Sequence, residues 1–181
     1  MISAISEVDI ALWDLLGKEL GAPIYKLLGG GAKRIKGYIT GEYHRQGKGV
    51  KELVEEVKNY VNQGFKMVKI KVGGLELSKD IKRLKALREE FGETLDIAVD
   101  ANNVYTFNEA LRARREFGKL GVVFFEEPIM TDHLDLSAEL VRLLEIPVAG
   151  YETAYILFES REIITMKAVD IVQADAAWSG G

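Results

Sequence analysis

The stretch FKMVKIKVGG, residues 65–74, combines β-branched residues with alternation and ends in a glycine pair. This pattern predicts a β-strand, and successive side chains of a strand point to opposite faces. Lys69 and Lys71 therefore share one face, while the valines and isoleucine between and beside them form the other. What surrounds this strand in the sequence decides both the fold and the purpose of the paired lysines.

Six strands are predicted along the chain, and each of the first five precedes a segment with helical periodicity. A further helix precedes the first strand and is expected to end at Gly21 and Pro23. The strands are short and apolar on both faces, as in a parallel sheet covered by helices. The expected strands lie within residues 34–43, 65–74, 95–103, 122–128, 146–153 and 169–181, and the helices after them within residues 50–64, 78–92, 106–121, 133–145 and 157–168.

Individual residues mark the ends of several of these helices. Gly64 is expected to stop the helix of residues 50–64, because glycine adopts the left-handed backbone conformation of a helix C-terminus. Ser78 is a plausible N-cap. Thr106 and Glu109 have the spacing of a capping box.

Alternating strands and helices allow either an open doubly wound sheet or a (β/α) barrel. The chain has neither the G-x-G-x-x-G nor the G-x-x-x-x-G-K-[ST] phosphate-binding pattern, so a nucleotide-binding open sheet is disfavoured. Asp100, Glu126, Glu152 and Asp175 each end a predicted strand, one strand–helix unit apart. A TIM-type barrel arranges such strand ends around one mouth, where its active sites are built.

Three of these acids, Asp100, Glu126 and Glu152, follow one another on consecutive strands and could meet at one point. A single strand-end acid usually caps a helix or faces water, but three in register predict a shared site. Gathered carboxylates repel each other, and a hard divalent cation removes that cost. Oxygen ligands without Cys or His favour Mg²⁺, with Mn²⁺ second and Ca²⁺ possible. Asn102 lies on the same face as Asp100 and could support that ligand or touch substrate.

The paired lysines have two interpretations. Lysines on an exposed edge strand prevent aggregation. Here the apolar face of the strand should pack on helices, so Lys69 and Lys71 are expected to point into the barrel, toward the acids. Adjacent ammonium groups and a nearby cation are expected to lower a lysine pKa, which makes a general base. A base, a divalent metal and a further acid suit abstraction of a proton next to a carboxylate.

Composition restricts the class of protein. The 181 residues suit one domain with a sizeable core, and the net charge of −4 argues against nucleic acid or an anionic membrane as partner. No cysteine is present, so disulfides and thiolate metal sites are excluded. No apolar run has the length of a membrane span, and acidic residues interrupt the N-terminal segment where a signal peptide would be apolar. A cytoplasmic location is therefore expected.

Several motifs together resemble the mandelate racemase/muconate lactonizing branch of the enolase superfamily. They are KIK, VDANN, FFEEP, IPVAGYET and the N-terminal ISEVDIALWDLLGKELGAPIYKLLGG. The resemblance implies Lys71 as the base with Lys69 as its helper. It also implies Glu127 as a neighbour on the other face and three metal ligands, which are Asp100, Glu126 and Glu152.

The motif VQADAAWSGG resembles the sixth-strand motif of that branch, in which Asp175 corresponds to the aspartate of a His-Asp dyad. The muconate-lactonizing and dipeptide-epimerase types carry a lysine in this region, and this chain has none after Lys167. The resemblance thus favours acid-sugar dehydratases or racemases. The dyad histidine would lie on a seventh strand, beyond Gly181; neither His44 nor His133 is placed for that role.

The family barrel has eight strands, and a full barrel takes about 200 to 250 residues. We therefore expect an incomplete barrel without the lid domain, divided into a linker helix and loop at residues 1–31 and a partial barrel at residues 32–181. Open sheet edges would favour self-association or a homo-oligomer. The expected activity is that of a Mg-dependent acid-sugar dehydratase, a lyase. The alternatives are a racemase or epimerase of the same superfamily and a catalytically inactive metal-binding fragment.

Overall fold

The computed structural model describes residues 1–31, 33–41, 43, 47–143 and 145–181. These residues form two compact units. The larger one contains residues 37–150 and 166–171, and the smaller one contains residues 1–36, 151–165 and 172–181. The expected division between residues 1–31 and 32–181 stays a prediction.

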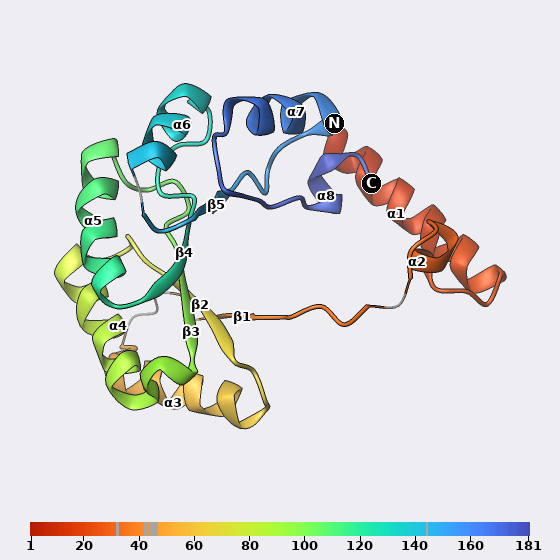
Figure 1. The fold of residues 1–181 in the computed structure, drawn as a ribbon. Coiled ribbons are helices and arrows are strands. Elements are labelled where there is room, and N and C mark those ends of the chain that lie inside the picture. The colour runs from red at the N-terminus through yellow and green to blue at the C-terminus, as the bar shows by residue number, and fades with distance from the viewer. Residues whose placement is uncertain (32, 42, 44–46, 144) are drawn as a thin grey trace. The chain divides into compact units, whose positions relative to one another are not determined.

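The sheet contains six strands in the order β1-β2-β3-β4-β5-β6, and the pairs from β1 to β5 are parallel (Figure 1). Strand order therefore follows chain order, as in the wall of a (β/α) barrel, whereas a doubly wound sheet reverses its order partway. The predicted parallel α/β architecture is confirmed. The strands are β1 (Ile39–Gly41), β2 (Met67–Lys71), β3 (Asp96–Asp100), β4 (Val122–Glu126), β5 (Val148–Gly150) and β6 (Ile171–Val172).

Helices connect the strands, and α3, α4 and α5 lie along one side of β2, β3 and β4 (Figure 1). A short 3₁₀ turn, η1 (Gly92–Thr94), follows α4. The helices after the strands of the larger unit are α3 (Val50–Asn62), α4 (Leu77–Phe91), α5 (Phe107–Lys119) and α6 (Leu134–Leu143).

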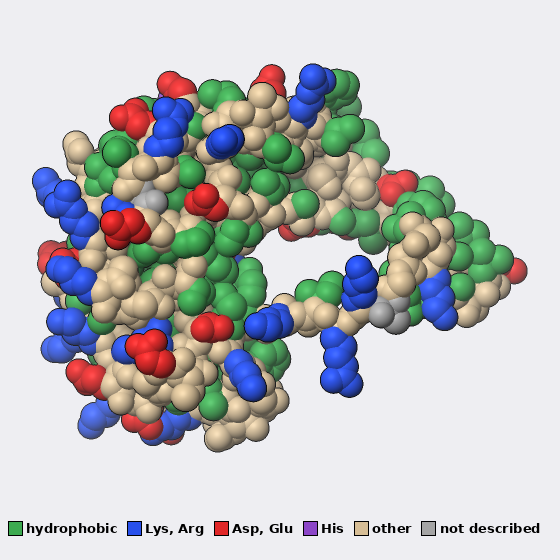
Figure 2. All heavy atoms as spheres, in the orientation of Figure 1, with side chains coloured by type: hydrophobic (Ala, Val, Ile, Leu, Met, Phe, Trp, Pro, Cys, Tyr) green, Lys and Arg blue, Asp and Glu red, His purple; other side chains and the backbone are tan. Residues whose placement is uncertain are grey.

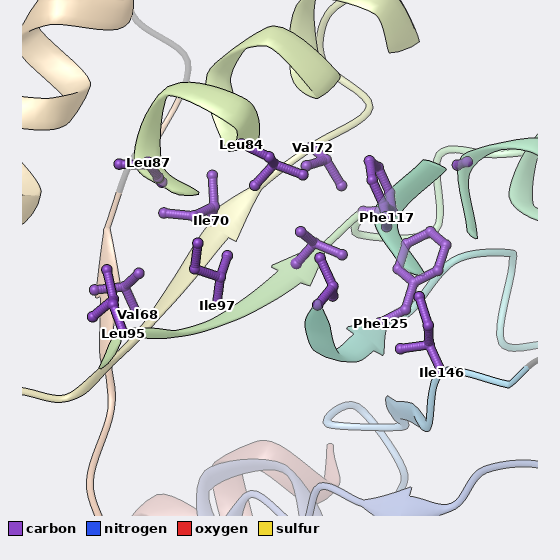
Figure 3. Close-up of a cluster of buried hydrophobic side chains, with 14 of the residues drawn as sticks. Val68, Ile70, Val72, Leu84, Leu87, Leu95, Ile97, Phe117, Phe125 and Ile146 are labelled. Carbon is purple, nitrogen blue, oxygen red and sulfur yellow. The ribbon is translucent and has the colours of Figure 1, made fainter. Parts of the chain in front are cut away.

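The main core lies between this helical layer and the sheet (Figure 3). Val68, Ile70 and Val72 enter it from β2 and its end, and they meet Leu84 and Leu87 of α4. All five are at most 4% exposed. Burial of each such side chain contributes about 1.5–3 kcal/mol. The apolar face of the lysine strand thus packs on helices as predicted, and alternation directs Lys69 and Lys71 to the opposite face.

Strand β4 contains one extra residue relative to β3. Ile97 lies opposite Val122 and Val99 lies opposite Phe125, so two residues of β3 correspond to three of β4. Strict alternation from Val122, which is in the main core, would put Glu126 on the helix-facing side. The bulge reverses the alternation, so that Phe125 enters the core and Glu126 faces the other way.

Helix boundaries agree with most of the end signals. The Thr106 hydroxyl accepts a hydrogen bond from the Glu109 amide, and the Glu109 carboxylate accepts one from the Thr106 amide, so the capping box is confirmed. Gly64 follows α3 with a φ of 93°, as expected of a stop. The Ser78 prediction was wrong: α4 begins at Leu77 with Glu76 as its N-cap, which leaves Ser78 inside the helix.

Charged side chains of both signs are intermixed over the outer surface of α3, α4 and α5 (Figure 2). Lys58 of α3 illustrates this, since its ammonium lies 3.2 Å from Glu55 and 3.0 Å from Glu90 of α4. Such exposed pairs contribute little to stability.

The smaller unit contains four helices: α1 (Ile2–Glu19), α2 (Ile24–Leu27), α7 (Ile156–Met166, whose last residue belongs to the larger unit) and α8 (Ala176–Ser179). The Gly180 amide donates a hydrogen bond of 2.9 Å to the Ser6 hydroxyl, which joins the end of the chain to α1. The segment of residues 169–181 was expected to be a strand, but β6 has only two residues and α8 follows it. Among all described residues, no helix is both long enough and apolar enough to cross a membrane.

Candidate functional site

Three neighbouring strands carry the candidate groups to the same end of the sheet. Lys71, the last residue of β2, lies opposite Asp100, the last residue of β3. Asp100 in turn lies opposite Glu126, the last residue of β4. The parallel register, together with the β4 bulge, therefore aligns one lysine and two carboxylates along one row.

Lys69 lies two residues before Lys71 on β2, and its side chain extends to the carboxylates of the row. Its Nζ donates to both oxygens of Glu126, at 2.6 and 2.7 Å, and lies 3.3 Å from Oδ2 of Asp100. Lys69, Asp100 and Glu126 are 6%, 1% and 0% exposed. Buried charges need partners of opposite sign, and here two carboxylates surround one ammonium.

Lys71 holds the other side of Asp100. Its Nζ lies 2.6 Å from Oδ2 of Asp100 and donates to Oδ1 of Asn102 at 2.7 Å. The Asn102 amide donates to Oδ1 of Asp100 at 2.9 Å. Both oxygens of Asp100 are thus engaged, Oδ2 by the Lys71 ammonium and Oδ1 by the backbone amide of residue 102.

The electrostatics of the cluster favour its charged forms. Burial lowers the pKa of Lys69, but the hydrogen bond and charge of Glu126 and the charge of Asp100 outweigh burial and raise it overall. Burial raises the pKa of Asp100, yet the bond from Lys71, the Asn102 amide and the charges of both lysines lower it overall. The expectation of a lowered pKa is therefore wrong for Lys69 in this arrangement, because its nearest groups are carboxylates rather than the other ammonium.

The donor atoms of this site are of the kind that a divalent cation prefers. Asp100 and Glu126 are buried oxygen donors in adjacent register, and Mg²⁺ is commonly held by one or two carboxylates that leave room for waters and substrate. Glu152 follows β5 in a turn and belongs to the smaller unit, where it is partly buried. In the part of the chain that the structure describes, no three acidic or histidine side chains form a ready metal cluster.

The remaining predicted residues belong to other elements of the chain. Asp175 belongs to the smaller unit and caps α8, where its Oδ1 accepts a hydrogen bond of 2.7 Å from the Ala177 amide. His133 is exposed directly before α6, in agreement with the surface role expected of it. His44 lies outside the described residues.

Two further residues that were not named from the sequence, Asn103 and Tyr38, contact Glu127 and Lys69. Asn103 donates from Nδ2 to Oε2 of Glu127 at 3.0 Å, and its backbone amide donates to the Glu127 carbonyl at 2.8 Å. Both residues have positive φ, 66° and 37°, which costs energy for residues other than glycine and clusters at functional sites. The Tyr38 ring centroid lies 5.6 Å from the Lys69 ammonium. The second asparagine of VDANN was the available signal for Asn103, whereas no local pattern marks Tyr38.

Proteins named for their activities are similar in sequence to this chain over almost its whole length. The chain is 56% identical to an arabinonate dehydratase of Saccharolobus solfataricus over 99% of this chain and 48% of that protein. It is 36% identical to a D-galactarolactone cycloisomerase of Agrobacterium fabrum, again over 99% of this chain and 48% of the relative. The chain thus spans about half the length of the curated relatives it matches.

Solved structures share the fold. A racemase from Streptomyces coelicolor A3(2) with bound magnesium has a TM-score of 0.91 and 34% identity, over 99% of this chain and 53% of that chain. The family described as "Enolase C-terminal domain-like" matches residues 52–181, and the family "Mandelate racemase / muconate lactonizing enzyme, N-terminal domain" matches residues 1–29. The chain therefore belongs to the mandelate racemase/muconate lactonizing branch of the enolase superfamily.

Proposed function

We propose that this chain carries the base and the metal ligands for abstraction of the proton α to the carboxylate of an acid sugar, in the lineage of the dehydratases. The observation that carries the proposal is the row of Lys71, Asp100 and Glu126 at the ends of three adjacent strands, with Lys69 below it. The 56% identity to an arabinonate dehydratase supports an acid sugar as substrate.

Lys71 is assigned the role of base because its side chain is the more exposed of the two lysines. Its side chain is 15% exposed, against 8% for Lys69, and it lies at the very end of β2. When neutral, the Lys71 amine takes the α-proton, and the electron pair of the C–H bond moves into the substrate carboxylate. Lys69 stays charged, because both oxygens of Glu126 hold it.

Asp100, Glu126 and Glu152 are the proposed ligands of Mg²⁺, with Mn²⁺ as a substitute of similar ligand preference. The bound cation supplies positive charge that stabilises the negative charge developing on the substrate carboxylate. Asn102, which is exposed beside Lys71, is proposed to donate to a substrate oxygen through its side-chain amide nitrogen.

Dehydration requires a second step after proton removal. The electron pair returns toward the α–β bond, and the β-hydroxyl leaves as water as an acid protonates it, which gives an enol. The enol loses its hydroxyl proton and gains a proton at the β-carbon, which gives a 2-keto-3-deoxy acid. Asp175 is proposed to assist that acid, as the resemblance to the His-Asp subgroup implies. Return of a proton to the α-carbon instead would give racemisation or epimerisation.

The test is exchange of the substrate α-proton. The chain is incubated with Mg²⁺ and a panel of acid sugars, arabinonate among them, in D₂O, and ¹H NMR records loss of the α-proton signal and appearance of a 2-keto-3-deoxy acid. We expect exchange that Lys71→Ala abolishes. Lys66→Ala is the matched control, because Lys66 is an exposed lysine directly before β2 begins, at the other end from Lys71.

Three outcomes separate the candidates. Exchange with loss of water supports the dehydratase lineage, and exchange without loss of water supports a racemase or epimerase. Binding of Mg²⁺ without exchange on any substrate of the panel contradicts the catalytic proposal and supports a metal-binding chain.

A further inference from the structure

Helix α4 carries a buried ion pair that the proposed chemistry does not use. Asp80 is 0% exposed, and its Oδ1 accepts a hydrogen bond of 2.9 Å from Nη1 of Arg83, whose side chain is 11% exposed. A buried carboxylate is costly unless charge and hydrogen bonds compensate it. Helix α4 packs on the core through apolar residues such as Leu84 and Leu87. The ion pair therefore needs an explanation other than packing.

Both members of the pair bind the backbone at the end of β2. Oδ2 of Asp80 accepts a hydrogen bond of 2.7 Å from the Gly73 amide. Nη1 of Arg83 donates to the Lys71 carbonyl at 2.8 Å. These two residues lie on either side of Val72. Helix α4 therefore binds the backbone directly after β2 and at its last residue, the proposed base Lys71.

The contacts of Asp80 and Arg83 lie just where β2 ends. The Val72 amide donates to the Asp100 carbonyl at 2.9 Å. Among the described residues, the last registered pair with β1 is Gly41 opposite Ile70. Arg83 satisfies the carbonyl of Lys71 at this position, which fixes the peptide plane from which the Lys71 side chain extends.

We propose that Asp80 and Arg83 are positioning residues that hold the backbone of Lys71 in register with Asp100. The inference rests on the proposed role of Lys71 as the base. Proton transfer depends on geometry at the scale of an ångström, and a misplacement of about 1 Å can cost about 100-fold in rate. The described hydrogen bonds of the pair reach the Lys71 carbonyl and the Gly73 amide, so the pair acts through the backbone that carries Lys71.

A purely structural role for the pair makes a different prediction, and α4 offers a matched control. Arg88 lies on the same helix and also binds backbone carbonyls, those of Leu120 at 3.0 Å and Leu95 at 2.8 Å. These carbonyls lie before β4 and β3 begin, away from the end that carries Lys71. If arginine–carbonyl bonds serve stability alone, removal of Arg83 and removal of Arg88 should affect activity alike.

The experiment compares Arg83→Met, Arg83→Lys and Arg88→Met in the full chain. Thermal unfolding gives their stability, and α-proton exchange with Mg²⁺ gives kcat and KM. We expect Arg83→Met to lower kcat by about 10- to 100-fold with KM within about twofold, because the metal ligands are untouched. Arg83→Lys keeps a charged donor and should recover most of kcat. Arg88→Met should lose stability with kcat near that of the unchanged chain.

A second readout does not need activity. The ¹⁵N resonance of the Lys71 ammonium, assigned by its loss in Lys71→Arg, reports the bonds to Asp100 and Asn102. It should shift or broaden in Arg83→Met and stay unchanged in Arg88→Met. If Arg83→Met does not fold, Asp80→Asn takes its place; it keeps an acceptor for the Gly73 amide but loses the charge that anchors Arg83, and we expect the same change in the resonance.

The two proposals fail in different ways. Absence of exchange in the unchanged chain contradicts the proposed function, and the ammonium resonance then decides the positioning role alone. An unchanged resonance in Arg83→Met or Asp80→Asn, or equal kcat in Arg83→Met and Arg88→Met, overturns the positioning role.

Discussion

The Lys69 ammonium binds both carboxylate oxygens of Glu126, at 2.6 and 2.7 Å, where the two side chains are 8% and 0% exposed. The partners are 57 residues apart in the chain and come together only because β2, β3 and β4 are adjacent in the sheet. Such a pair is costly to break, since removal of one partner leaves the other as an uncompensated buried charge.

Replacement of Lys69 by methionine should therefore destabilise the larger unit. We expect Lys69→Met to lower the free energy of unfolding by about 3–5 kcal/mol, as measured by urea denaturation followed by circular dichroism. Lys66→Met, at an exposed position of the same stretch, should change it by less than about 0.5 kcal/mol. The double variant Lys69→Met/Glu126→Gln also removes the unpaired Glu126 charge, and it should regain most of the lost free energy of unfolding. A single-variant loss no larger than that of the Lys66 control would contradict the importance of the pair.

Magnesium should stabilise the chain through the same carboxylates. A ligand that binds only the folded state at 100 times its Kd adds about 2.7 kcal/mol to stability. We expect Mg²⁺ to raise the melting temperature of the unchanged chain, EDTA to reverse the rise, and Lys69→Met to show a larger rise because the cation replaces the lost positive charge. Isothermal titration should show that Asp100→Asn, Glu126→Gln and Glu152→Gln each weaken binding.

Glu127→Gln is the control for the ligand assignment. Glu127 is nearly as buried as Asp100 and Glu126, but its carboxylate accepts a hydrogen bond from Asn103, and a glutamine oxygen can accept the same bond. Binding of Mg²⁺ should be retained in this variant. Loss of binding in Glu127→Gln, with retention in Glu126→Gln, would reverse the assignment of the second ligand.

The faces of β2 could be predicted from the sequence because alternation is a local property. Val68, Ile70 and Val72 have to face the helices, and Lys69 and Lys71 then follow. The bulge in β4 could not be predicted, since alternation counted from Val122 places Glu126 on the wrong face. Glu126 was expected at the site because it ends its strand one strand–helix unit after Asp100, and because of the FFEEP motif, rather than from alternation.

Two other features were not predicted from the sequence. Asp80 and Arg83 have the spacing of an ordinary surface ion pair on a helix, and only the packing of α4 against the end of β2 buries them. The short helix α8 follows a segment rich in β-branched residues, and the Asp175 side chain starts it by accepting a bond from the Ala177 amide. Tertiary packing thus decides the burial of Asp80 and Arg83, whereas a local side-chain cap starts α8.

Gly73 should be intolerant of any side chain. Its φ is 82°, and a Cβ there would lie 2.2 Å from Cγ1 of Val104. We expect Gly73→Ala to cost more than Gly64→Ala, because Gly64 has a similar φ of 93° but open space around it. The left-handed backbone accounts for about 1 kcal/mol in both variants, and the clash adds to it only at Gly73. Denaturation of both variants and of Gly73→Ala/Val104→Ala checks this; equal losses at the two glycines would show that the clash relaxes at no cost.

Tyr105 should make the larger unit sensitive to alkali. Burial, together with the charges of Asp80 and Glu109, raises the pKa of the Tyr105 hydroxyl above its usual value. Among the described residues, that buried hydroxyl has no hydrogen-bond partner. Below about pH 10 the phenol is neutral in both the folded and the unfolded chain, and stability does not depend on it. Above that pH the unfolded chain loses the proton first, so stability falls as pH rises toward the folded-state pKa.

Tyr105→Phe should remove this dependence. At neutral pH the variant should be as stable as the unchanged chain or slightly more stable, because it deletes an unsatisfied buried hydroxyl. At about pH 10.5 it should be more stable by a further margin of about 1 kcal/mol. Tyr25→Phe, at an exposed tyrosine, is the control for loss of a phenol hydroxyl at the surface. Parallel stability curves for Tyr105→Phe and the unchanged chain between neutral and alkaline pH would show that the Tyr105 hydroxyl ionises as easily in the folded chain as in the unfolded one.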